Sequence, residues 1–177
     1  LLANPSSDRN QGLPATRGRS TLSRMSGFLK GLKPEGVTSL ESAFTLAAQK
    51  IKSRSHLVVV SDFLQPGAGL KGLAQLRYRK HRLTLIQLLT PLELNPRQAM
   101  SPGEWELFDP EPAQHAESLR LDLGHHSFDR YGEALARHKA GLKDFCRKAD
   151  GVFVSAATDF DPVAFFSEEL RTAGLLG

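Results

Sequence analysis

The chain has 177 residues and a mass of 19.4 kDa, which is enough for one compact domain and too few for two of ordinary size. Hydrophobic residues make up 40% of the chain and charged residues 24%, a balance that excludes wholesale disorder. No apolar run approaches the roughly 20 residues that a membrane-spanning helix needs, and the net charge of +4 permits acidic partners without requiring them.

Two helices are expected after a polar opening segment. Residues 3–19 are rich in Pro, Gly, Ser and Asn and show no apolar period, which predicts a surface loop. Apolar residues then recur at helical spacing in two stretches: Leu22, Met25, Leu29 and Leu32, followed by Leu40, Ala43, Phe44, Ala47 and Ile51. Ser20 or Thr21 is the expected cap of the first helix and Pro34 its end. Because the chain opens with Leu1 and not with Met, we expect it to be part of a longer polypeptide.

A strand, a helix and a strand come next. Residues 57–64 form a Val-rich run interrupted only by Ser61 and Asp62, which predicts a strand covered on both faces, as in parallel sheets. The segment "GLKGLAQLRYRKH" returns to helical spacing, and "RLTLIQLLTP" is a second buried strand. This order predicts a βαβ unit.

The second half adds a hairpin, a long helix, a third strand and a last helix. The segment "EWELFDPEPAQHAESLRLDL" alternates around an Asp-Pro turn and predicts two antiparallel strands. An amphipathic helix over residues 130–150 leads to the strand "GVFVSAAT", and Asp161 and Pro162 open the last helix. We therefore expect a three-layer, Rossmann-like α/β fold. Its sheet is mostly parallel, with helices on both faces and a β-hairpin insertion.

The single cysteine, Cys146, falls on the apolar stripe of the long helix. We interpret it as a small buried side chain. One cysteine cannot form an internal disulfide or a thiolate metal site, and its scarcity fits a reducing compartment. We therefore expect a cytoplasmic location, with an upstream membrane anchor left open.

The first candidate site is the end of the Val-rich strand. Ligands bind at the carboxyl ends of strands in parallel α/β sheets, and Asp62 is predicted to lie at such an end. Ser61 and Asp62 either terminate the strand by bonding turn amides or take part in ligand binding. Thr38 is a second candidate ligand, although Thr38 and Glu41 also have the spacing of a capping box. The two roles of Thr38 are compatible, because a hydroxyl oxygen has two lone pairs.

An ordered series of segments carries a resemblance over most of the chain. The segments are "GVTSLESAF", "HLVVVSDFL", "HRLTLIQLLTPLEL", "WELFDPE" and "YGEALARHKAGLKDFCRKADGVFVSAATDFDP". In order and spacing they resemble the C-terminal half of bacterial von Willebrand factor A-like proteins. These belong to a domain-of-unknown-function family usually encoded beside MoxR-type AAA+ ATPases.

The resemblance implies a metal-ion-dependent adhesion site in which Mg²⁺ is held by oxygen ligands from three loops. Thr38 and Asp62 match the second and third loops, with Ser61 and Ser39 in supporting positions, and Mg²⁺ favours such hard oxygen ligands. The Asp-x-Ser-x-Ser motif of the first loop does not occur in this sequence. We therefore expect residues 1–177 to form a single domain that lacks its first strand and that loop, and to bind no ion by itself.

Catalysis is the first alternative. A hydrolase needs clustered acids or an activated nucleophile, and the acids near one another are Asp109 with Glu111 and Asp159 with Asp161. The adjacent His125 and His126 are expected in a loop before a helix capped by Ser127. The sequence has no glycine-rich phosphate loop with P-loop spacing and no recognisable nucleophile elbow. These observations favour a protein that is not an enzyme, with a metal-dependent hydrolase kept as an alternative.

Nucleic-acid binding is the second alternative. In "RYRKHR", the basic residues Arg77, Arg79, Lys80 and Arg82 surround a tyrosine and could follow a phosphate backbone. The cluster also falls at the predicted end of a helix, where the helix dipole favours cations. Taken with the resemblance, the sequence favours a non-catalytic protein-interaction module. Its expected partner is a MoxR-type AAA+ ATPase that acts in complex maturation or metal insertion.

Overall fold

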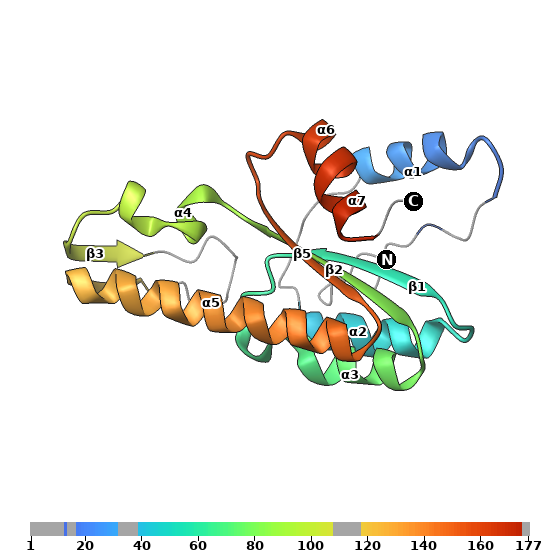
Figure 1. The fold of residues 1–177 in the computed structure, drawn as a ribbon, viewed down its shortest axis with the longest axis horizontal. Coiled ribbons are helices and arrows are strands. Elements are labelled where there is room, and N and C mark those ends of the chain that lie inside the picture. The colour runs from blue at the N-terminus through green and yellow to red at the C-terminus, as the bar shows by residue number, and fades with distance from the viewer. Residues whose placement is uncertain (1–12, 14–16, 32–38, 108–117, 175–177) are drawn as a thin grey trace. The chain divides into compact units, whose positions relative to one another are not determined.

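The computed structural model describes residue 13 and residues 17–31, 39–107 and 118–174 (Figure 1). The described residues fall into two compact units. The first contains α1, α2, the 3₁₀ turn η1 and α3 as far as Leu76, and the second contains the remaining elements. In the part of the chain that the structure describes, no helix is long and apolar enough to cross a membrane.

The first unit begins with α1 (Thr21–Lys30), which confirms the first predicted helix. Its N-cap residue is Ser20, whose side chain makes no capping hydrogen bond. None of its residues is buried, and the side chains of Leu22 and Leu29 are 77% and 59% exposed. The apolar spacing thus predicted the helix correctly. The apolar side chains of this helix are nevertheless not buried.

The second helix, α2 (Leu40–Lys50), packs against η1 (Pro66–Gly69) and α3 (Leu70–Tyr78). A Cβ atom at Gly72 would lie 2.6 Å from the Cβ of Phe44, so glycine permits the close approach of the two helices. The predicted cap was one residue early, because the N-cap is Ser39, whose Oγ accepts from the Ser42 N–H. The Glu41 carboxylate accepts instead from the Gly72 N–H at 3.1 Å and thereby joins α2 to α3.

The second unit is built on a parallel sheet of β1 (His56–Ser61), β2 (Arg82–Leu89) and β5 (Val152–Ala157). The strand order is β1-β2-β5, with both pairings parallel. The middle strand β2 is the most deeply buried, and the alternating side chains of Leu83, Leu85 and Leu89 are fully covered. The three strands predicted from Val-rich and Leu-rich runs are therefore confirmed.

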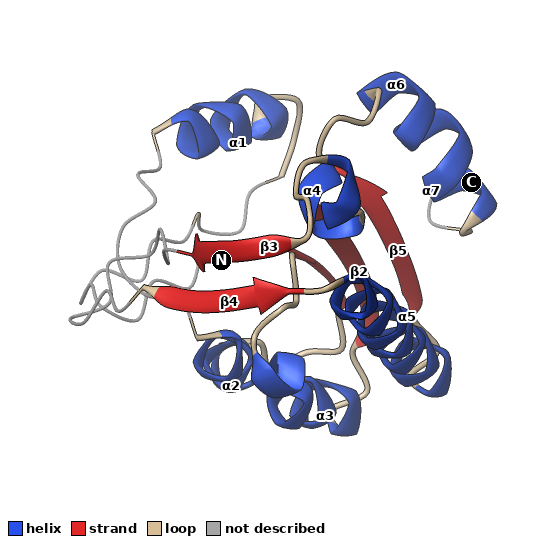
Figure 2. Ribbon diagram, turned by 90° about the vertical axis from the view of Figure 1, so that its left-hand side faces the viewer, coloured by secondary structure: helices blue, strands red, loops and turns tan. Residues whose placement is uncertain are grey.

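Helices cover both faces of this sheet (Figure 2). The long helix α5 (His125–Lys148) packs on one face, where Leu142 and Cys146 are buried. On the other face lie α6 (Pro162–Ala164), a π-helical turn η3 (Phe165–Glu169) and α7 (Leu170–Thr172). There Phe165 and Leu170 form a core with Val154 and Ala156. The predicted three-layer α/β architecture is confirmed.

One face of β1 is open in the described residues. Val58 and Val60 are 58% and 57% exposed, whereas Leu57 and Val59 on the other face are partly covered. The prediction that this strand is covered on both faces is wrong for this chain. The reason is its position, because β1 is an edge strand and the core of α6, η3 and α7 covers β2 and β5.

Between β2 and α5 the chain forms α4 (Pro91–Leu94), the 3₁₀ turn η2 (Pro96–Gln98) and the hairpin strands β3 (Gly103–Leu107) and β4 (Leu119–Leu123). The antiparallel pairing confirms the predicted hairpin, while its Asp-Pro turn lies outside the described residues. The predicted start of the long helix was late. Helix α5 begins at His125 with Gly124 as N-cap, so Ser127 is not the cap and His125 and His126 belong to the first turn.

Candidate functional site

The candidate site begins at Asp62, which follows the last residue of β1 at the carboxyl end of the parallel sheet. Its side chain is exposed, and its Oδ1 accepts hydrogen bonds from the Leu64 N–H at 3.1 Å and from the Ser61 hydroxyl at 3.3 Å. The Ser61 Oγ in turn accepts from the Phe63 N–H at 3.1 Å. Asp62 therefore ends the strand as a turn residue, and one carboxylate oxygen, Oδ2, takes part in none of these bonds.

Two buried side chains hold this turn in place. Phe63 is 0% exposed and has a positive φ of 56°, a conformation that costs a non-glycine residue free energy. The Gln87 side chain, on the middle strand, donates from Nε2 to the Asp62 carbonyl oxygen at 2.7 Å. The turn that carries Asp62 is thus fixed by the buried side chain of Phe63 and by the hydrogen bond from Gln87 on β2.

A polar row runs across the sheet beside this turn. Ser61, Gln87 and Ser155 are register partners on the three neighbouring strands, so their side chains share one face. Within the described residues, Gln87 Oε1 and Ser155 Oγ are buried without a hydrogen-bond partner. Sequence reasoning missed Gln87 and Ser155. The visible signal was a polar residue inside each of two otherwise apolar strands, "LIQLL" and "VFVSAA".

The predicted metal ligands are only partly among the described residues. Thr38 lies outside them, and Ser39 belongs to the first unit, where its hydroxyl caps α2. Across the described ranges there is no group of three or more His, Cys, Asp or Glu side chains that could hold a metal ion. Asp62 is therefore a single carboxylate with one neighbouring hydroxyl. That set is too small to fit Mg²⁺, which takes near-octahedral oxygen coordination and usually draws on more than one protein ligand.

The residues weighed for catalysis are not brought together at Asp62. Asp161 is the N-cap of α6 and accepts from the Val163 N–H at 2.8 Å, which confirms its predicted capping role. Asp159 is exposed after β5. Asp109 and Glu111 lie outside the described residues. Asp161 and Asp159 thus have a structural and a solvated position, and neither is hydrogen-bonded to a hydroxyl or thiol in the bonds that the structure shows.

The basic residues at the end of α3 take up different positions. Arg77, Lys80 and Arg82 line a hollow at the edge of the sheet where β2 begins, and Lys148 from the end of α5 joins them. Arg79 is exposed and is not part of this lining. The basic residues that are neighbours in the sequence therefore do not all line the hollow, because Arg79 lies outside it. Lys148, from a helix distant in sequence, is added to the lining.

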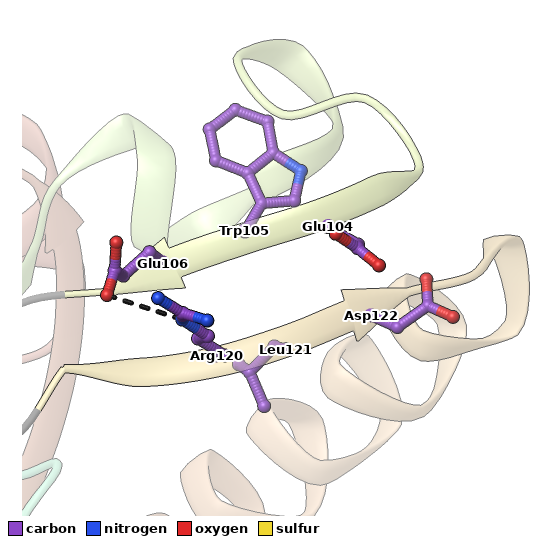
Figure 3. A pocket seen from close by; sticks show the side chains of 6 residues that line it. All are labelled: Glu104, Trp105, Glu106, Arg120, Leu121 and Asp122. Carbon is purple, nitrogen blue, oxygen red and sulfur yellow. Dashed lines mark ion pairs between the residues drawn. The ribbon is translucent and has the colours of Figure 1, made fainter.

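A second hollow, of about 440 Å³, lies on the β3–β4 hairpin (Figure 3). Glu106 and Arg120 are register partners and form an ion pair at 3.6 Å, while Glu104 faces Asp122 directly across the ribbon. Like charges in directly opposed positions destabilise a pair of strands. These four side chains lie on one face of the hairpin, and they supply acids and one ion pair but no nucleophile or buried charge.

Comparison with known proteins identifies a matching protein family. The family described as "Protein of unknown function DUF58" matches residues 2–141, which is more than three quarters of the chain. No curated protein and no solved structure matches it.

Proposed function

We propose that this chain, which belongs to the DUF58 family, is a non-catalytic protein-interaction module of the von Willebrand factor A type. One observation carries the proposal: Asp62 presents an exposed carboxylate at the carboxyl end of a parallel strand, in a turn fixed by Phe63 and Gln87. Ligands of parallel α/β sheets bind at that end. A rigid, exposed acid there suits recognition of a basic group on a partner, because little ordering entropy is lost on binding.

The residues beside Asp62 have roles that suit binding. The Ser61 hydroxyl donates to Asp62 Oδ1 and so orients the carboxylate. The second oxygen, Oδ2, remains available to a partner. Leu64, which is 40% exposed, adds an apolar contact beside the acid. An acid flanked by an apolar side chain matches the mixed character of protein interfaces.

For the metal, we propose only a contribution from Asp62. The described residues alone do not fit Mg²⁺, so an ion would need Thr38 and further oxygen ligands from outside the described residues. A bound Mg²⁺ would supply a positive charge, and the partner group at this end of the sheet would then be a carboxylate in place of a basic group, as the resemblance implies. The role of Asp62 in the turn does not depend on the ion, since its bonds are to Ser61 and Leu64.

The proposed partner is a MoxR-type AAA+ ATPase, with a role in complex maturation or metal insertion. The support is the resemblance of the ordered segments, from "GVTSLESAF" to "VSAATDFDP", to proteins usually encoded beside such ATPases. Neither nucleic-acid binding nor hydrolysis is favoured at this end of the sheet, where the described site residues are one acid, hydroxyls and an amide.

The test measures binding of the protein to a MoxR-type ATPase by calorimetry. Asp62→Asn keeps the Oδ1 acceptor for the Leu64 N–H but removes the charge, so we expect the fold to persist and the affinity to fall at least about tenfold. The matched control is Asp159→Asn, which removes the same charge from the loop after β5. Equal affinity for Asp62→Asn and the wild type would refute the proposed contact. Ester or phosphodiester turnover abolished by the same substitution would refute a non-catalytic role.

A further inference from the structure

A hollow of about 330 Å³ lies at the amino edge of the parallel sheet, the end opposite Asp62. It is lined by residues from two chain reversals. One joins the end of α3 to β2 and supplies Arg77, Lys80, His81 and Arg82, and the other joins α5 to β5 and supplies Lys148 and Asp150.

The lining carries a strong excess of positive charge. Four cationic side chains, from Arg77, Lys80, Arg82 and Lys148, face one carboxylate, that of Asp150, so the net charge is +3 with His81 neutral. Within the described residues, Arg77, Lys80 and Arg82 form no ion pair, and the Lys148 Nζ lies 3.8 Å from Asp144. Lys148 is thus ion-paired, while the other three cations have no such pair within the described residues. Like charges that line one hollow repel one another, and a bound anion would relieve that repulsion.

His81 also lines the hollow and is itself buried. The side chain is 3% exposed, and its Nδ1 accepts a hydrogen bond from the Ser55 N–H at 3.2 Å. In the neutral ring the proton is therefore on Nε2. That Nε2 is buried and has no partner among the described residues. A buried donor without an acceptor costs free energy. Because this Nε2 is closed off from solvent, an anion in the hollow would become its acceptor only after the lining residues move, and that contact would offset the cost.

Lys80 adds a conformational argument. It has a positive φ of 60° and ends the turn after α3, with its N–H donating to the Arg77 carbonyl at 2.8 Å. Glycine is the residue that adopts this conformation without strain. A cation near a helix C-terminus is often explained by the helix dipole alone. The dipole does not account for a lysine at a glycine-type position, nor for the unpartnered donor of His81.

We propose that this hollow binds the phosphate group of a small phosphorylated molecule. Arginine and lysine form charge-assisted hydrogen bonds with phosphate oxygens, and two guanidinium groups can each donate in a bidentate manner. The cations come from two loops and line one hollow. A nucleic-acid backbone requires cations spaced along an extended track, and Arg79, which would extend such a track, is not part of the lining.

The test is a calorimetric titration of the chain with inorganic phosphate at low ionic strength. Lys80→Gly removes the cation and places glycine where φ is positive, so the fold should persist, as a thermal melt would show. We expect phosphate affinity to fall at least about tenfold in this variant, because a charge-assisted contact is lost. His81→Asn, which keeps an acceptor near the Ser55 N–H but removes the Nε2 donor, should also weaken binding.

The matched control is Arg79→Gln, which removes the same charge from the same loop outside the hollow. We expect it to change phosphate affinity by less than about twofold, as for an exposed charge. Equal losses of phosphate affinity in Arg79→Gln and Lys80→Gly would show that diffuse positive charge attracts the anion and would refute the site. Absence of phosphate binding by the wild type would also refute it.

A further titration uses single-stranded DNA. Binding tighter than that of phosphate and dependent on Arg79 would identify a nucleic-acid surface and overturn the proposal. Asp62→Asn should leave phosphate binding unchanged, so this result is independent of the proposed protein contact.

Discussion

The Nε2 of Gln87 donates a hydrogen bond of 2.7 Å to the main-chain oxygen of Asp62. A side chain of the middle strand thus holds the end of the neighbouring strand. Gln87 is 0% exposed and the bond is partly buried, so its loss would leave the buried Gln87 amide without this acceptor. The orientation of the exposed Asp62 carboxylate therefore depends on a residue that no ligand touches.

Gln87→Glu tests this dependence. An ionised glutamate cannot donate to the Asp62 carbonyl and would be buried, so at pH 7 we expect the free energy of unfolding to fall by about 3 kcal/mol or more. Burial raises the pKa of a carboxyl group in the folded state. The missing stability should return as the pH falls from 7 toward the unfolded pKa of about 4.3, because protonation is then favoured in the folded chain.

Chemical denaturation at a series of pH values measures the difference between wild type and variant. The control is Gln98→Glu at an exposed position, where we expect a change within about 0.5 kcal/mol. A difference for Gln87→Glu that does not vary with pH would contradict the proposed burial of the new carboxyl group.

The open face of β1 leads to a second prediction. Val60 is 57% exposed, so Val60→Thr should change the stability of this chain by less than about 0.5 kcal/mol. Leu85→Ala on the covered middle strand, at 0% exposed, should cost about 2–5 kcal/mol. Denaturant unfolding of both variants gives the comparison.

Two helical glycines should respond in opposite ways to alanine. At Gly72 the new Cβ would lie 2.6 Å from the Phe44 Cβ, so α2 and α3 must separate, at a cost of about 1–3 kcal/mol. At Gly141 on α5 nothing lies within 4 Å of the new Cβ, and alanine should stabilise the helix by up to about 1 kcal/mol. Thermal melts of the two variants decide the sign, and destabilisation by Gly141→Ala would contradict the open surroundings of that position.

The fourth prediction concerns Cys146, which is 1% exposed. Burial raises the pKa of its thiol to about 11, although a hydrogen bond with the Leu85 backbone opposes part of the shift. At pH 8 the folded chain should hold only about one thousandth of this thiol as thiolate, the reactive form. Reaction with a disulfide reagent should be slow in the native state and fast in guanidinium. Rapid reaction of the native chain would contradict the burial of Cys146.

The same pKa has a consequence for stability. A thiol whose pKa is higher in the folded state than in the unfolded state contributes stability below the unfolded pKa. This contribution is lost as the pH rises from about 8.5 through about 11. Cys146→Ala should lack this part of the alkaline loss, and comparing the slopes of unfolding free energy against pH for the two chains isolates it.

Several elements could be predicted because their signals are local. Asp161 and Pro162 open a helix wherever they stand together, since the carboxylate caps free N–H groups and proline suits the first turn. Apolar spacing predicted α1, α2 and α5, and short apolar runs predicted the strands. The end of the Val-rich run at Asp62 was likewise visible, because a polar pair after a buried run marks the edge of a sheet.

The exact first residue of a helix was harder to predict. Both Thr38 and Ser39 can cap a helix, and the choice of Ser39 goes with the engagement of Glu41 by Gly72, a residue from another helix. The start of α5 at His125 in place of Ser127 follows from the point at which β4 ends. A one-residue or two-residue shift of this kind depends on contacts between elements, which no local pattern contains.

The sequence by itself determined the α/β class, the order of elements and the position of Asp62 at a strand end, because these follow from periodicity and from capping chemistry along the chain. Only the tertiary structure decided which residues meet. Strand pairing set Ser61, Gln87 and Ser155 in one row, and the two crossovers brought Lys148 to Arg77 and Lys80 while leaving Arg79 outside. The physical reason is that side chains distant in sequence become neighbours only through register and packing, which depend on the whole sheet.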